Sequence, residues 1–174
     1  MSNPMINPMA PIHTEADAKA AARASAVAIF IGVLYGVFGL VFGMEAMRAG
    51  VEAQMAANPQ AGMTSDMMIN IAMGMAVAFI VIQLVLGWVQ WAKPNIVIPI
   101  IFVILVAWGL VQMPLAMQAA ANMGIEAPQT PMWMTVVAVI VMLVELVLHI
   151  TGIRGAAKLD KIRKAAPVQT DEFL

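Results

Sequence analysis

One acidic residue lies within a long apolar stretch of the sequence, where an ionised side chain is costly. Glu145 falls eight residues before Ile153, about 12 Å along a helix from the expected end of that stretch. His149 follows four residues later, on the same helical face. The residue types allow two interpretations. Glu145 is either held by a polar partner as a structural lock, or it relays protons or cations through His149.

An internal repeat adds Gln83 to this pair. A shift of 62 residues places Gln83-Leu-Val-Leu on Glu145-Leu-Val-Leu, and a shift of 70 residues places 37–49 on 107–119. The matches favour a duplicated helical hairpin over chance similarity between apolar runs. In a parallel repeat, Gln83 lies at the depth of Glu145 across a pseudo-two-fold axis. The structural lock is then a hydrogen bond between these two side chains.

Four glycines share one face of the first apolar stretch: Gly32, Gly36, Gly39 and Gly43. Their spacing of four, three and four residues contains two small-xxx-small motifs, which let another helix approach closely. The partner is either a neighbouring helix of the same chain or a second copy in a homodimer. In both cases the glycines have a structural role.

Methionine is abundant, with 17 residues in the chain. Met44 and Met47 form a pair on one helical face, and so do Met113 and Met117. Thioethers are soft ligands for Cu(I), but methionine also fills irregular space in helix packing. No histidine or cysteine accompanies these pairs on their expected side of the membrane. Packing is therefore the favoured interpretation, and Cu(I) binding is a weaker alternative.

Other kinds of chemistry lack their signatures in this sequence. The chain has no cysteine, which excludes thiolate metal sites and cysteine nucleophiles. It has no phosphate-binding glycine loop, no His-Glu-x2-His zinc motif and no serine nucleophile elbow. Its net charge of −1 gives no overall basic field for nucleic acid. The sequence therefore predicts no enzyme activity, no cofactor and no nucleic-acid partner.

The candidate residues are carried by elements that are predicted to cross a membrane. Hydrophobic residues make up 62% of the chain and charged residues 11%, against about 25% charged in soluble proteins. Four apolar runs each reach the roughly 20 residues that a bilayer requires, and in lipid such runs must be helical. The runs cover about 24–44, 68–91, 96–117 and 132–153. The predicted fold is an all-α integral membrane protein, with two parallel-repeat hairpins packed as a bundle.

This fold divides the chain into four parts. They are an N-terminal segment at 1–18, hairpins at 19–92 and 93–153, and a basic helix with a tail at 154–174. The turn at 92–95 is very short, so the second and third spans are predicted to be antiparallel neighbours.

Local signals predict the ends of the helices. Thr14, with Asp17 three residues on, is the expected N-cap of the first helix. Residues 45–57 have helical spacing and are expected to extend the first span. The expected caps of the second and fourth spans are Ser65 or Asp66, and Thr130. The last helix is expected to continue to about Ala166, before Pro167 ends it.

Basic residues predict the orientation. Lys19 and Arg23 precede the first span, Lys93 lies in the short turn, and only Arg48 lies in an opposite loop. The positive-inside rule then places both termini in the cytoplasm, in a membrane of the bacterial inner-membrane type. Five more basic residues follow the fourth span and suit anionic lipid headgroups. They are Arg154, Lys158, Lys161, Arg163 and Lys164.

Two functions are consistent with the sequence. The favoured one is a non-enzymatic accessory subunit or homo-oligomer, because little of the chain is expected outside the membrane. Its expected partners are the lipid bilayer and either further copies of itself or the subunits of a larger membrane complex. The alternative is a small transporter or channel with a proton or cation relay at Glu145, His149 and Gln83.

Overall fold

The computed structural model describes residues 3–57, 62, 64–122 and 132–165, and this part of the chain folds entirely into helices and their connections. Four of its helices are long and apolar enough to cross a membrane, whereas α2 is short. The helices are α1 (Glu15–Phe42), α2 (Met44–Ala57), α3 (Ser65–Ala92), α4 (Val97–Asn122) and α5 (Met132–Ala165). The predicted all-helical fold and its four long apolar helices are confirmed.

The first helix begins as predicted. The Thr14 hydroxyl accepts a hydrogen bond from the Asp17 amide at 3.1 Å, and the Asp17 carboxylate accepts one from the Thr14 amide at 3.0 Å. This reciprocal capping box satisfies amides that have no partner within the helix. At the other end of the chain, α5 is continuous to Ala165, so the predicted extension beyond the fourth span is also confirmed.

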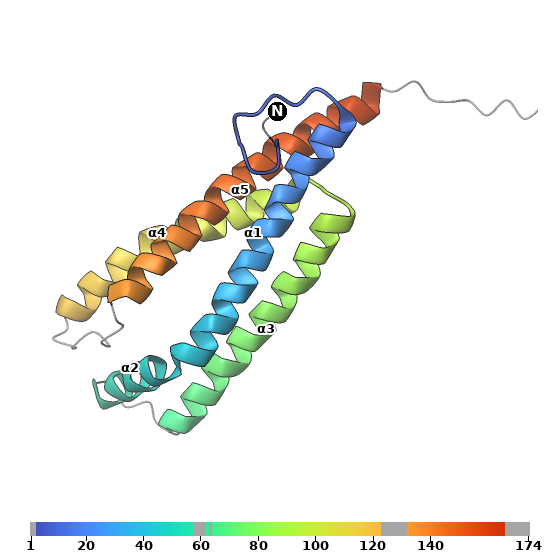
Figure 1. Ribbon diagram of the computed structural model, residues 1–174. Coiled ribbons are helices and arrows are strands. Elements are labelled where there is room, and N and C mark those ends of the chain that lie inside the picture. The colour runs from blue at the N-terminus through green and yellow to red at the C-terminus, as the bar shows by residue number, and fades with distance from the viewer. Residues whose placement is uncertain (1–2, 58–61, 63, 123–131, 166–174) are drawn as a thin grey trace, which may run out of the picture.

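Two predicted details between α1 and α3 are wrong. Residues 45–57 are helical, but they do not extend the first span, because α1 ends at Gly43 and α2 leaves in a new direction (Figure 1). Gly43 has a ψ angle near zero, which takes the chain out of regular helical geometry. The N-cap of α3 is Thr64, one residue before the expected Ser65 or Asp66. The expected cap at Thr130 lies outside the described residues.

The four long helices are arranged in the order α3–α1–α5–α4. The closest pair is α1 with α5, while α3 packs against α1 and α4 packs against α5 (Figure 1). The paired helices are antiparallel, since Ala22 lies against Gly155 and Gly32 lies against Glu145. The start of α1, the α3–α4 turn at Lys93 and the end of α5 therefore lie together, at what we call the basic end.

The prediction that spans two and three pack together is wrong. Helices α3 and α4 diverge from their short turn and make almost no contact with each other. Lys93 has an extended φ of −130° and is followed by proline, which turns the chain sharply away from α3. The α1–α5 pair then lies between the two diverging helices. A two-fold axis relating the hairpins requires α3–α4 packing equivalent to α1–α5, so the two hairpins do not pack in that way.

The core of the molecule is a seam of small residues between α1 and α5. Gly152 and Gly155 on α5 face Ser25 and Ala22 on α1 so closely that an added Cβ at either glycine meets the other helix. Without large side chains, two helices gain extensive backbone contact. The fully buried small residues of α1 are Ala18, Ala21, Ala22, Ala24, Ser25, Ala26 and Ala28.

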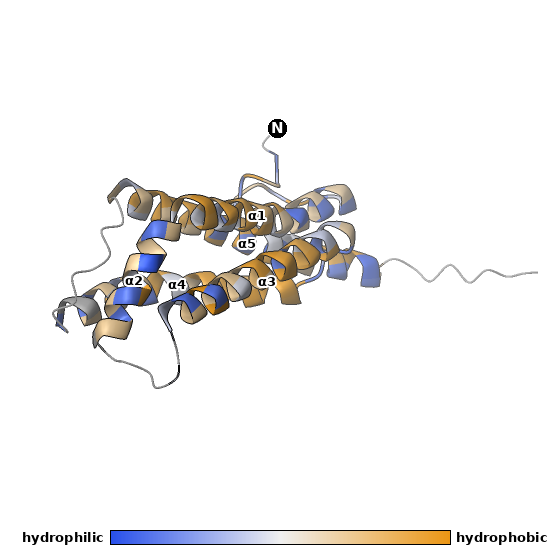
Figure 2. Cartoon of the chain, turned by 90° about the horizontal axis from the view of Figure 1, so that it is seen from below, coloured by the Kyte–Doolittle hydropathy of each residue, from blue (hydrophilic) through white to orange (hydrophobic). Residues whose placement is uncertain are grey.

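The outward faces of α3 and α4 carry large apolar side chains. Ile82 and Val85 of α3 are 54% and 58% exposed, and Ile104 and Trp108 of α4 are each 63% exposed. Figure 2 shows apolar residues along most of the long helices and polar residues near their ends and on α2. This is the pattern of helices whose outer surface is solvated by hydrocarbon.

Candidate functional site

A cavity of about 350 Å³ lies between the four long helices, and all four contribute to its lining. Three of its sides are closed, because α1 packs on α5, α3 on α1, and α4 on α5. The remaining side is the gap between the diverging α3 and α4. The polar side chains of the lining are Tyr35 from α1, Gln83 from α3, and Glu145 and His149 from α5.

Glu145 lies at the wall of this cavity and depends on Gly32 for its space. It is 9% exposed, and a Cβ added to Gly32 would lie 2.8 Å from Glu145 Oε1 and 3.8 Å from Gln83 Oε1. Gln83 and Glu145 therefore approach the same point of α1 from two different helices, α3 and α5. Among the described residues, however, no hydrogen bond joins them. The predicted structural lock between these two side chains is not formed.

His149 is held by other groups than the sequence indicated. Its Nδ1 lies 2.8 Å from the Ser25 hydroxyl oxygen, and its ring stacks on Phe102 with 5.3 Å between centroids. The side chain is 1% exposed, yet it reaches the cavity lining. Within the described part of the chain it has no hydrogen bond to Glu145. Ser25 was missed because a single serine in an alanine-rich helix looks like ordinary packing.

A second group of buried polar contacts fixes the basic end of the bundle. The Gln90 side chain is 0% exposed, and it donates to the carbonyls of Ala22 at 3.3 Å and Asn95 at 3.1 Å. Its carbonyl accepts from the Asn95 amide at 3.2 Å. Nearby, the Arg23 guanidinium donates to the Trp91 carbonyl at 3.1 Å, and its Cζ lies 4.8 Å from the centroid of the Trp91 ring. These contacts join α1, α3 and the α3–α4 turn.

The glycines predicted to form one packing face have different surroundings. Gly32 faces Glu145, and Gly36 faces Ile80 of α3 at 3.3 Å from an added Cβ, so both pack within the chain. Gly39 has no atom within 4 Å of an added Cβ. Gly43 is the C-cap of α1. The closest glycine contacts are instead those of α5 at the seam.

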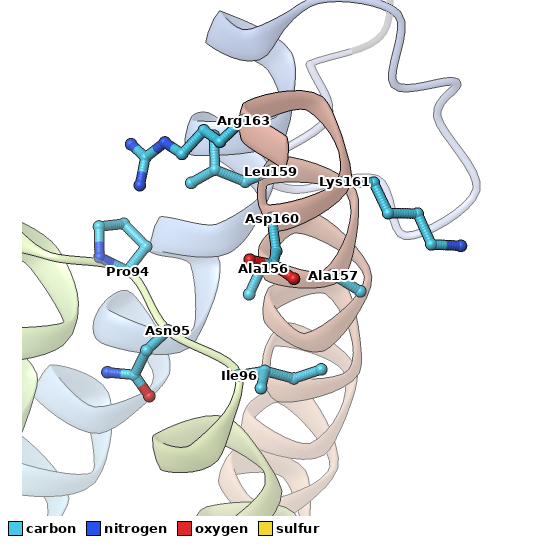
Figure 3. A pocket seen from close by; sticks show the side chains of 9 residues that line it. All are labelled: Pro94, Asn95, Ile96, Ala156, Ala157, Leu159, Asp160, Lys161 and Arg163. Atoms are coloured by element: carbon cyan, nitrogen blue, oxygen red, sulfur yellow. The ribbon is translucent and has the colours of Figure 1, made fainter. Parts of the chain in front are cut away.

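The five basic residues of α5 are all exposed and divide into two groups. Arg163 lies 3.3 Å from a Glu15 oxygen and Lys164 lies 2.7 Å from one of Asp160. A hollow of about 450 Å³ lies beside Pro94, and both Arg163 and Lys161 contribute to its lining. In Figure 3 their side chains leave α5 in different directions. A second hollow of about 350 Å³ is lined by Ile12 together with Arg154, Lys158 and Lys161.

The methionine pairs do not share one site. Met44 and Met47 lie on α2, which packs on α3 and α1, whereas Met113 and Met117 lie on α4. In the described chain no extensive packing between α2 and α4 brings the thioethers of these two helices together. The geometry therefore gives the Cu(I) alternative no support.

The helices and the site together indicate a class of protein, namely a multi-pass helical membrane protein with a polar cavity among its helices. No protein-family model matches the sequence, and no curated protein or solved structure is significantly similar to it.

Proposed function

We propose that the chain is a small, non-enzymatic membrane transporter. Its solute binds at Glu145, and protons or cations cross the membrane by way of this residue. One observation carries the proposal. A carboxyl group lies at the wall of a cavity between four apolar helices, with no hydrogen-bonding partner among the described residues. An acid in such surroundings is costly unless a ligand, a proton or water compensates it.

This geometry favours a transporter over a purely structural role for Glu145. A structural role requires a partner that satisfies the carboxyl, as Ser25 does for His149 on the same helix. Gln83 is close enough to Gly32 to serve, but it is not bonded to Glu145. A transporter instead needs both groups to remain free for a solute.

The proposed relay runs from the cavity toward the basic end. Glu145 faces Gly32, and His149 with Ser25 lies one to two helical turns closer to that end. Gln90 and Asn95 then reach the turn between α3 and α4. In the orientation that the basic residues favour, this end faces the cytoplasm of a bacterial-type inner membrane, with both termini inside.

Flux in proteoliposomes tests the proposal. We expect the wild-type chain to dissipate an imposed proton or alkali-cation gradient faster than empty liposomes do, and Glu145→Gln to reduce the rate to that of empty liposomes. The matched control is Glu52→Gln on α2, which removes an exposed carboxylate and should leave the flux unchanged. Flux that survives Glu145→Gln, or its absence in the wild type, contradicts the proposal.

An associating subunit is a second candidate, and the open surface around α1 favours it. Gly39 of α1 and Gly74 of α3 each have no atom within 4 Å of an added Cβ. A helix of a second copy packed on Gly39 would be displaced by leucine. We then expect Gly39→Leu to lower the mass of the complex in mild detergent, with Gly74→Leu as the matched control. An unchanged mass removes Gly39 as a contact between copies.

A further inference from the structure

The composition of the cavity indicates what kind of solute it suits. Its lining contains one acidic side chain, Glu145, and no lysine or arginine. It also contains the rings of Tyr35, Phe79 and Phe102, from three helices, and the His149 imidazole, which is bonded to Ser25. The remaining lining is mainly aliphatic, glycine and methionine. An anionic solute would be repelled by the carboxylate, and a neutral one would leave it without a partner.

We propose that the cavity binds a lipophilic organic cation, with Glu145 as its counter-ion. The inference rests on the proposed function, in which this cavity holds the solute. A carboxylate in apolar surroundings attracts a cation strongly, and aromatic faces add further attraction for an ammonium group. Because α3 and α4 both line the cavity and make almost no contact with each other, we expect a solute with apolar substituents to enter between them from the bilayer.

An organic cation fits this lining better than a metal ion does. Hard cations such as Ca²⁺ take six to eight oxygen ligands, or several waters in place of them. The described lining provides the Glu145 carboxyl, the Gln83 amide oxygen and the Tyr35 hydroxyl, while His149 is bonded to Ser25. An alkylammonium ion needs only one counter-ion and apolar contact.

The volume limits the size of the solute. A cavity of about 350 Å³ is at the lower end of the range of roughly 300–1,000 Å³ for small-molecule sites. It accommodates an amine with one aromatic ring or a short alkyl chain, but not a whole phospholipid. The expected solute is therefore a small hydrophobic amine or quaternary ammonium ion.

The chain contains its own reporter for this experiment. Tyr35 is the only tyrosine in the sequence and it lines the cavity. Biosynthetic 3-fluorotyrosine therefore gives a single fluorine NMR signal from the site in the full chain, reconstituted in nanodiscs. The probes are benzyltrimethylammonium and neopentylbenzene, which have the same shape and differ in that only the first is charged.

We expect benzyltrimethylammonium to shift the Tyr35 signal in a saturable way and to bind more tightly than neopentylbenzene. Glu145→Gln should lower the affinity for the cation by more than about tenfold and leave the affinity for the neutral compound nearly unchanged. Phe79→Leu is a second variant that leaves the charge in place, and Phe79 is half-exposed, so the fold should tolerate the change. Loss of this ring should weaken the cation a few-fold.

Three results overturn the inference. If the two probes bind equally and Glu145→Gln has no effect on either, the cavity binds by apolar contact alone and the cation inference is wrong, while the flux of Glu145→Gln still decides the transporter proposal. If neither probe shifts the signal while gradient dissipation persists, the cation inference is wrong and the transporter proposal survives. If both the shift and the flux are absent, both fall.

Discussion

The two sides of the bundle are built in opposite ways. On one side, α1 and α5 approach until Gly155 and Ala22 meet through their backbones, and alanines fill the seam. On the other side, α3 and α4 diverge from a short turn and leave a gap beside the cavity. Both sides consist of equally apolar helices, so hydropathy does not explain the difference. The difference is explained by the sizes of the side chains at the helix contacts.

Polar groups follow the same division. On the closed side, the Ser25 hydroxyl and His149 are buried and bonded to each other. At the basic end, Gln90 makes three hydrogen bonds. On the open side, Glu145 and Gln83 line the cavity, and no hydrogen bond joins them. The polar groups of the closed side are therefore satisfied within the bundle, and those of the open side are the ones that the proposed transporter would use.

Adding one methyl group on each side tests this division most severely. Gly155→Ala directs a Cβ into the Ala22 backbone, which cannot move aside as a flexible side chain can. We expect it to lower the free energy of unfolding by about 3 kcal/mol, at the upper end for overpacking. Gly74→Ala, in the open part of α3, should raise it by up to about 1 kcal/mol, because alanine favours helix over glycine.

Both variants are compared by thermal or SDS-induced unfolding in one detergent, followed by circular dichroism. Opposite signs for the same chemical change support the contrast between a closed and an open side. Equal effects at Gly155 and Gly74 show that the seam is not closely packed, and the contrast is then lost.

Local and one-dimensional features were predictable from the sequence. Hydropathy identified the four long helices, and the Thr14–Asp17 spacing identified the first cap. Gln83 and Glu145, which the alignment paired, both lie near Gly32, but the predicted bond between them is not formed. These features depend on composition and on residue spacing along a helix, and both can be read from a single segment of the chain.

The choice of helix partners could not be predicted in this way. A short turn favours adjacent packing, but the small residues of α1 and α5 offer closer contact to each other than to either neighbour. The roles of Ser25 and Gln90 could not be predicted for the same reason, because they depend on which helix lies opposite. The Gly152-x2-Gly155 spacing of α5 is the signal in the sequence for the seam.

Replacing either of two glutamines of α3 with leucine compares the two sides again, with a smaller expected effect on the free energy of unfolding. Gln90→Leu leaves the Ala22 carbonyl and both Asn95 backbone groups without their partner. We expect a loss of about 1 to 2 kcal/mol in unfolding free energy. The Gln83 side chain makes no hydrogen bond within the described chain, so Gln83→Leu should change the free energy of unfolding by less than about 0.5 kcal/mol, while slowing flux through the cavity.

The combination of readouts separates the two roles. Unfolding in detergent reports the loss at Gln90, and proteoliposome flux reports the loss at Gln83. If Gln83→Leu destabilises the bundle as much as Gln90→Leu does, then Gln83 makes a structural bond within the bundle, and the open side contributes to stability as the closed side does. If it stabilises the chain and slows flux, a free amide is retained at this position at the expense of stability, as expected for a side chain that contacts a solute.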